Sequence, residues 1–352
     1  VISVGNNAFS GCTGLQNNSV INKSNADYMY NVVNNKFVTI LKYIGNKNIS
    51  NINIQNSRIN LSNDAATLNP ILGIAGSIIG ETLTSSNTTS NQLRLADISL
   101  NNTDIISSHI SGGLIGKVDT NTLNLFGSIV LSDVLTEAVL NNQIAGNSFN
   151  TYAGGLFGSA KINSLVFTNN SKINISDAPT AHVTADNVDL ARAYAGGLTG
   201  HQQSLLVNYN GLINTNGAIA NAALDPTATG INFAQSYAGG LDGATGDGAS
   251  VFNYQIAPTS MISVGNNIQA TSLGNNESAF AGGLFGLVNS SLTQPSIINF
   301  ASNNPVTINA LNISALTSGR GLILDPNALL FAPNIVPPPI SLASNNATDW
   351  PI

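Results

Sequence analysis

The sequence predicts an all-β fold, a right-handed parallel β-helix (β-solenoid) built on a sequence repeat of about 42 residues. One observation is a recurring phrase, Ala-Gly-Gly-Leu-x-Gly, whose first glycines fall at positions 76, 112, 154, 196, 239 and 282, with successive differences of 36, 42, 42, 43 and 43. Another is that short runs of alternating apolar and polar residues follow the phrase, as expected for half-buried strands. A period this regular is typical of stacked copies of one unit, each burying its apolar face against its neighbours.

Four copies of the phrase are entered through an aromatic residue, at 152–158, 194–200, 237–243 and 280–286. A copy at 111–116 lacks the aromatic, and one at 75–80 is decayed. A Gly-Gly pair permits positive φ at a sharp corner, and it also allows close backbone approach where units stack. The predicted structural repeat residues are Gly112, Gly113, Leu114, Gly154, Gly155, Leu156, Gly196, Gly197, Leu198, Gly239, Gly240, Leu241, Gly282, Gly283 and Leu284.

Two ladders of side chains follow from the repeat. We expect the leucines to point inward and the aromatic residues to form a second ladder of Tyr152, Tyr194, Tyr237 and Phe280. Stacked aromatics serve packing more often than ligand recognition, and both roles remain open here.

The strands predicted after the phrase include 164–167, 204–207 and 250–253. Three short strands with tight turns fit in about 20 to 25 residues, so a 42-residue period is most simply two coils. One coil with a long loop is the alternative. No segment has a sustained helical pattern of apolar residues, and the two weak candidates for helices are residues 131–140 and 186–193.

Three regions are expected along the chain. Residues 1–70 are degenerate N-terminal coils with a possible cap or insertion, and the phrase Ile-Ser-Val-Gly-Asn-Asn at 2–7 recurs letter for letter at 262–267. Residues 71–325 form the regular solenoid. Residues 326–352 are rich in proline, which terminates strand pairing, so they form a cap or a docking tail.

Composition narrows the classes of partner. Charged residues make up 8% of the 352 residues, the net charge is −6, and the 11 Lys and Arg residues are scattered. Nucleic acid and anionic membranes both require clustered cations, so neither partner is expected. Cys12 is the single cysteine of the sequence, so an internal disulfide is excluded. It is either a small buried apolar residue, or it forms an intermolecular disulfide or a reactive thiol. No transmembrane segment is apparent, and the chain begins at Val1 without Met, which is interpreted as a mature chain without signal peptide.

Candidate chemistry is sparse. Asp242 and Asp247 lie in a glycine-rich stretch at 239–248 that is either a calcium site or a polar turn. The three histidines, His109, His182 and His201, fall in different repeats, with His201 in a variable surface position, and no nucleophile or metalloprotease motif occurs. We therefore expect no catalytic residues and no other cofactor.

The copies GGLIG, GGLFG, GGLTG, GGLDG and GGLFG resemble the GLUG-type repeat of large bacterial surface proteins and secreted peptidases, over residues 70–300. The chain departs from that family in its longer period and in the polar residues Thr199 and Asp242 after the leucine. More loosely, it resembles the β-helix passengers of autotransporter and haemagglutinin-type adhesins. These resemblances imply a location outside the cell or on its surface, a role in adhesion or surface structure, and no catalytic residues.

The expected function is that of a non-enzymatic extracellular structural protein. Open ends of a β-helix invite strand pairing, so head-to-tail self-association into a surface fibre is the first hypothesis. A monomeric adhesin passenger that binds host cells or glycans is the alternative, and a polysaccharide-active β-helix enzyme is the second alternative.

Overall fold

The computed structural model describes residues 21–24, 27–29, 37–38, 47–61, 73–82, 92–142, 148–168, 171–185, 190–224, 233–246, 253–257, 260–274, 276–288, 297–300, 306–308, 312–317 and 340–342. All regular elements in these ranges are β-strands, which confirms the all-β class. The strands belong to two sheets, a larger one of twenty described strands and a smaller one of seven.

The larger sheet contains β1 (Ile21–Ser24), β2 (Asp27–Met29), β4 (Lys47–Leu61), β6 (Ile79–Glu81), β7 (Gln92–Ser107), β9 (Ile115–Asn142), β11 (Phe157–Phe167), β12 (Lys172–Ile175), β13 (Thr180–Ala185), β15 (Thr199–Gln202), β16 (Leu206–Tyr209), β17 (Leu212–Leu224), β19 (Asp242–Thr245), β20 (Asn253–Ile256), β21 (Met261–Leu273), β23 (Phe285–Val288), β24 (Ile297–Phe300), β25 (Val306–Ile308), β26 (Asn312–Thr317) and β27 (Ile340–Leu342). The smaller sheet contains β3 (Phe37–Val38), β5 (Ile74–Gly76), β8 (Ile110–Gly112), β10 (Phe149–Gly154), β14 (Leu190–Gly196), β18 (Phe233–Gly239) and β22 (Asn276–Gly282).

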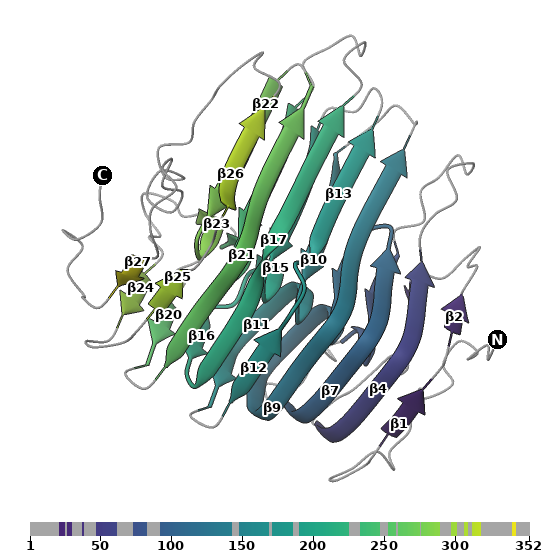
Figure 1. Ribbon diagram of the computed structural model, residues 1–352, viewed down its shortest axis with the longest axis vertical. Helices are drawn as coiled ribbons and strands as arrows, with labels where there is room; N and C mark the ends of the chain where they lie inside the picture. Colours follow the sequence, from purple (N-terminus) through teal and green to yellow (C-terminus); the bar gives the residue numbers. More distant parts are fainter. Residues whose placement is uncertain are drawn as a thin grey trace.

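Apart from β27, the described strands pair in parallel with the equivalent strand of the next repeat. In the smaller sheet Tyr152 pairs with Tyr194, 42 residues later, and in the larger sheet Phe157 pairs with Thr199, also 42 residues later. One period therefore supplies one layer of strands, and the expectation of two coils per period is wrong. Figure 1 shows the layers lying side by side in sequence order, from β4 to β21 and β26.

A layer accommodates so many residues because its long strands bend without leaving the sheet. In β4 and β7 the bends lie at equivalent positions, where Asn51 and Asn56 have φ of 56° and 47°, and Asp97 and Asn102 have φ of 51° and 48°. Asn and Asp reach this left-handed region more readily than other residues with side chains. The Asn102 amide also donates a 2.7 Å hydrogen bond to the Asn56 side chain, so the bends of neighbouring layers are linked.

The described parts of both candidate helices lie in strands. Residues 131–140 belong to β9, where Val134, Thr136, Ala138 and Leu140 are buried at every second position. This two-residue period suits a strand and not a helix. Of residues 186–193, the described part belongs to β14 and also alternates in burial.

The size of the buried side chains changes across each layer. Leucines, isoleucines and aromatic rings fill one part, including the leucines that follow the glycine pairs. In another part β14 lies against β17, and the residues facing inward are mostly alanines, as at Ala193 and Ala220. Small side chains let the two strands approach closely at native packing density.

The first and the last described strands, β1 and β27, belong to the same larger sheet. Strands β1 and β2 pair with β4, and β4 pairs with β7, so part of the region before residue 70 continues the layers of the later repeats. At the other end β27 pairs with β25. Cys12 and the prolines between 333 and 339 lie outside the described residues.

Candidate functional site

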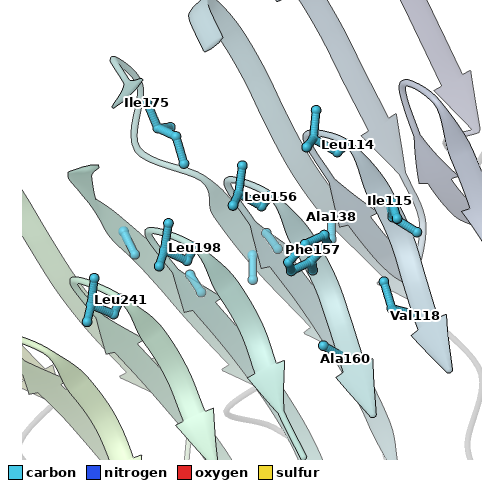
Figure 2. Packing of buried hydrophobic residues seen from close by; sticks show 14 of the residues in the cluster. Leu114, Ile115, Val118, Ala138, Leu156, Phe157, Ala160, Ile175, Leu198 and Leu241 are labelled. Atoms are coloured by element: carbon cyan, nitrogen blue, oxygen red, sulfur yellow. The ribbon is translucent and has the colours of Figure 1, made fainter. Parts of the chain in front are cut away.

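The glycine turns form the first feature shared by all regular repeats. The tip of each turn joins a strand of the smaller sheet to one of the larger sheet, as Gly197 and Leu198 join β14 to β15. Backbone hydrogen bonds continue through the tips, because the Leu198 amide donates to Leu241 O at 2.7 Å and the Leu156 amide donates to Leu198 O at 2.8 Å. Figure 2 shows the leucine side chains in equivalent places in neighbouring layers. The predicted inward leucine ladder is formed by the buried side chains of Leu114, Leu156, Leu198, Leu241 and Leu284.

Close backbone approach, and not positive φ, explains the glycine pairs. A Cβ atom at Gly196 would collide with the Thr199 carbonyl oxygen, and one at Gly197 would collide with the Gly240 carbonyl oxygen of the next layer. The described glycines with positive φ are instead Gly127, Gly211, Gly217, Gly246 and Gly274. The expectation of positive φ at the repeat glycines is therefore wrong.

The aromatic ladder is formed as expected. Ring centroids lie 5.0 Å apart between Tyr152 and Tyr194, 4.9 Å between Tyr194 and Tyr237, and 5.0 Å between Tyr237 and Phe280, and each pair is stacked. The rings of Tyr194, Tyr237 and Phe280 are buried and cluster with Ala244. Since each inner ring is stacked between two neighbours, the ladder presents ring edges and hydroxyl groups more than ring faces. Packing is the role that this geometry favours.

His201 joins the ladder from the opposite side of the glycine turn. Its ring stacks against Tyr152 at 5.6 Å and against Tyr194 at 5.4 Å, although sequence reasoning placed it at a variable surface position. His109 meets the Tyr152 ring edge-on at 5.5 Å. Two histidines from different repeats therefore lie against one tyrosine. The sequence offered no signal for this contact because it depends on how β15 folds back beside β14.

Polar groups line the hydroxyl side of the ladder. Arg192 Nε donates a 2.7 Å hydrogen bond to Gln235 Oε1, which also accepts one of 3.1 Å from the Tyr237 hydroxyl. Burial raises the pKa of the Tyr152 and Tyr194 hydroxyl groups, and the nearby Arg192 charge opposes this rise in both. These tyrosines stay protonated at neutral pH and act as hydrogen-bonding groups rather than as bases.

Asp242 lies in the core, not in a turn. It occupies β19, and its side chain is fully buried. The Tyr209 hydroxyl donates a 2.9 Å hydrogen bond to Asp242 Oδ2, while Oδ1 has no hydrogen-bond partner. Burial raises the pKa of Asp242 to about 7, and hydrogen bonds from Tyr209 and Thr199 oppose this rise.

Several polar groups gather around Asp242 in two adjacent layers. Thr199 pairs with Asp242 in register, and Gln202 pairs with Thr245, all with buried side chains. Burial and the neighbouring Asp242 also raise the pKa of the Tyr209 and Tyr254 hydroxyl groups. The polar residues Thr199 and Asp242 were recognisable in the sequence as interruptions of an apolar position, but their partner Tyr209, whose hydroxyl group binds Asp242, was not.

This placement does not fit the calcium-binding turn expected for Asp242 and Asp247, nor a solvated polar turn at Asp242. Calcium prefers several oxygen ligands around one ion, whereas the Asp242 carboxyl is enclosed and bound to a phenol. Asp247 lies outside the described residues. Within the described ranges, no three His, Cys, Asp or Glu side chains are grouped so as to hold a metal ion.

Most other titratable residues lie apart from one another, although burial and the nearby Asp104 charge raise the pKa of Glu137. His182 contacts Thr184 at 2.8 Å, and burial lowers the pKa of its imidazole. Asp104 lies 3.8 Å from Arg58 in a largely exposed ion pair. Asp97 instead accepts a hydrogen bond from the Ser128 amide, which stabilises a strand bend.

The last layer presents strand edges. Among the described strands, β26 pairs only with β21, and β24 pairs only with β20. Leu316 of β26 is 57% exposed. Such an edge offers backbone donors and acceptors to another strand.

Comparisons with known proteins found no matching family model, no matching curated protein and no matching solved structure. Among the described residues, no helix has the length and apolar character needed to cross a membrane.

Proposed function

We propose that the chain is a non-enzymatic extracellular structural protein, the subunit of a bacterial surface fibre. In this proposal its layers form a right-handed parallel β-solenoid, and copies join head to tail through the end layers. The observation that carries the proposal is the edge strand β26, which pairs on one side only among the described strands.

The composition of β26 supports this role. Soluble proteins protect edge strands with Lys, Pro or bulges, because an uncovered edge templates pairing with another chain. The β26 sequence, Asn-Ile-Ser-Ala-Leu-Thr, contains neither a charge nor a proline. Its exposed Leu316 adds apolar surface that a second copy would bury.

The stacked ladders support the proposal, because the interactions between layers can recur at a joint between copies. Inside the chain, successive layers gain parallel backbone pairing and contacts between identical side chains, as at Tyr194 and Tyr237. The same interactions repeated across a junction produce an open filament if the contact does not close into a ring. The low content of charged residues, 8%, keeps repulsion between copies small.

The test is negative-stain electron microscopy of the native chain, with light scattering across a concentration series. We expect filaments and a scattering mass that rises with concentration. Leu316→Lys, which places a charge on the edge strand, should shorten or abolish the filaments. Leu135→Lys is the matched control, because Leu135 is also an exposed leucine but lies on β9, inside the stack.

Isolated particles at every concentration, or equal loss of filaments in both variants, would contradict the fibre proposal. The adhesin alternative would then be the preferred function, and the next experiment would be a screen for binding to glycans and host cells. The aromatic ladder supports that alternative weakly, because stacking between Tyr194 and Tyr237 covers the ring faces that sugars use. The polysaccharide-enzyme alternative has one interacting pair of carboxyl groups among the described residues, because the Asp104 charge adds to burial in raising the pKa of Glu137.

A further inference from the structure

The strand β27 is exceptional in its direction. It pairs antiparallel with β25 through Val306 and Leu342, Thr307 and Ser341, and Ile308 and Ile340. All other strand pairs recorded among the described residues are parallel. Since β21 pairs with β25 on one side, β27 covers the other edge, where the next layer would continue the stack (Figure 1).

A second observation concerns the sequence of the segment that pairs with β25 inside the chain. Its inner edge pairs in parallel with Ile262, Ser263 and Val264 of β21, and the cap strand β27 reads Ile-Ser-Leu. The phrase Ile-Ser-Val-Gly-Asn-Asn that begins at Ile262 occurs once more, letter for letter, at residues 2–7. The chain therefore carries a second copy of the segment that already pairs with β25.

We propose, building on the fibre function, that the outer edge of β25 is the docking surface for residues 2–4 of a second copy of this chain. The strand β27 occupies this edge in the free subunit and is displaced when copies join. The incoming strand adopts the parallel register of β21, which places Ser3 of the second copy opposite Thr307, as Ser263 is opposite Thr307 within the chain.

Length and continuity favour the exchange. The cap contributes three residues against β25 and nothing recorded against β26. In β21 the same phrase continues onto β26, where Asn267 pairs with Asn312. An incoming copy of the phrase can thus extend over both edges, and longer pairing outcompetes a three-residue strand because isolated short pairings are only marginally stable.

The test is disulfide trapping between two populations of the full chain, both carrying Cys12→Ser. One population carries Ser3→Cys, and the other carries Thr307→Cys. Neighbouring strands lie about 4.8 Å apart, which is within the range of Cα–Cα distances that a disulfide spans. We expect about tenfold more mixed dimer than with Ser3→Cys and Lys172→Cys, because docking raises the effective concentration of the two thiols. Lys172 is the control position because it is exposed on β12, inside the stack.

Opening the cap should increase the trapping. Adjacent residues in a strand point their amides to opposite sides, so one of Ser341→Pro and Leu342→Pro removes a donor to β25. We expect one of these changes, made in the Thr307→Cys chain, to raise mixed-dimer yield, and a proline at Ser344, outside β27, to leave it unchanged. Conversely, oxidised Thr307→Cys/Ser341→Cys ties β27 to β25 and should lower light-scattering mass until a reductant restores it.

The two proposals fail in different ways. The docking proposal would be overturned if filaments formed equally with β27 tied to β25 or displaced from it, and if the mixed-dimer yield were no higher than with Lys172→Cys. The fibre function would then still stand. No association in any variant, including those with the opened cap, would overturn both.

Discussion

The Tyr209 hydroxyl donates a 2.9 Å hydrogen bond to the carboxyl group of Asp242, which belongs to the following layer. Both side chains are enclosed in the core, between a layer that contributes Phe157 and a layer that contributes Phe285. A polar contact therefore joins two particular layers in a core that is otherwise largely apolar. A buried polar group destabilises the fold unless it has a hydrogen-bond partner. The free energy of unfolding should therefore depend on the protonation of Asp242 and on the Tyr209 hydroxyl group.

Asp242 should make the chain less stable as pH rises. Burial raises its folded-state pKa from 3.8 to about 7, so the folded chain holds the proton more tightly than the unfolded chain. The contribution of Asp242 to the free energy of unfolding is complete below pH 3.8, declines as pH rises toward 7, and is lost above that value. The whole change is about 4 kcal/mol at most. Asp242→Asn should remove this dependence in urea titrations at several pH values.

The matched control for this change is Asp97→Asn. Asp97 is exposed at a strand bend, and asparagine keeps both an acceptor oxygen and the tolerance for its φ of 51°. A pH profile that is unchanged in Asp242→Asn, or altered equally in Asp97→Asn, would show that the buried carboxyl does not control the dependence.

Tyr209→Phe should destabilise the fold by about 1 to 3 kcal/mol, because it removes a donor from a buried carboxyl. The pKa of Asp242 should rise further, since this hydrogen bond lowers it. Tyr237→Phe serves as the control, because its hydroxyl bonds to the partly buried Gln235 and its loss should cost less than about 1 kcal/mol. Equal losses in urea unfolding would argue against a special role for the Tyr209 bond.

Gly197→Ala should destabilise the fold by about 3 kcal/mol or more, because the new methyl group meets the backbone of the next layer. The new Cβ atom would meet the Gly240 carbonyl oxygen, and Thr215 Cβ would lie 2.8 Å from it. Neither neighbour is the end of a flexible side chain that could move away. Gly265→Ala is a milder comparison, since its nearest neighbour is the Asn216 side-chain oxygen at 2.9 Å. The midpoint of urea unfolding distinguishes the two, and similar midpoints would contradict the packing explanation.

The aromatic ladder can be tested at Tyr194, which stacks on two neighbours and on His201. Tyr194→Ala should cost about 3 to 5 kcal/mol through lost packing, whereas Tyr194→Phe retains the ring and should cost less than about 1.5 kcal/mol. Thermal unfolding of both variants measures the difference. If Tyr194→Phe were as damaging as Tyr194→Ala, the hydroxyl group rather than the stacking would be responsible.

Features that depend on repetition were predictable from the sequence. Parallel in-register pairing brings equivalent positions together, so the leucine row through Leu198 and the aromatic row through Tyr194 follow from spacing alone. Features that depend on the path within one layer were not. His201 reaches Tyr194 only because β15 lies beside β14 after the turn, and Asp242 faces the core only because the position after Leu241 points inward.

The sequence by itself indicated that the chain is all-β and that its regular glycine turns recur about every 42 residues. It also indicated which residues around those turns stack on one another, because equivalent residues at a constant period meet when successive repeats pair in parallel. Only the tertiary structure decided that each period is one layer, since the left-handed residues Asn51 and Asp97 bend long strands where the sequence pattern suggested separate short ones. It also decided the role of the repeat glycines and the burial of Asp242. Both depend on how closely neighbouring backbones approach and on which wall of the layer a side chain faces, and a one-dimensional period contains neither quantity.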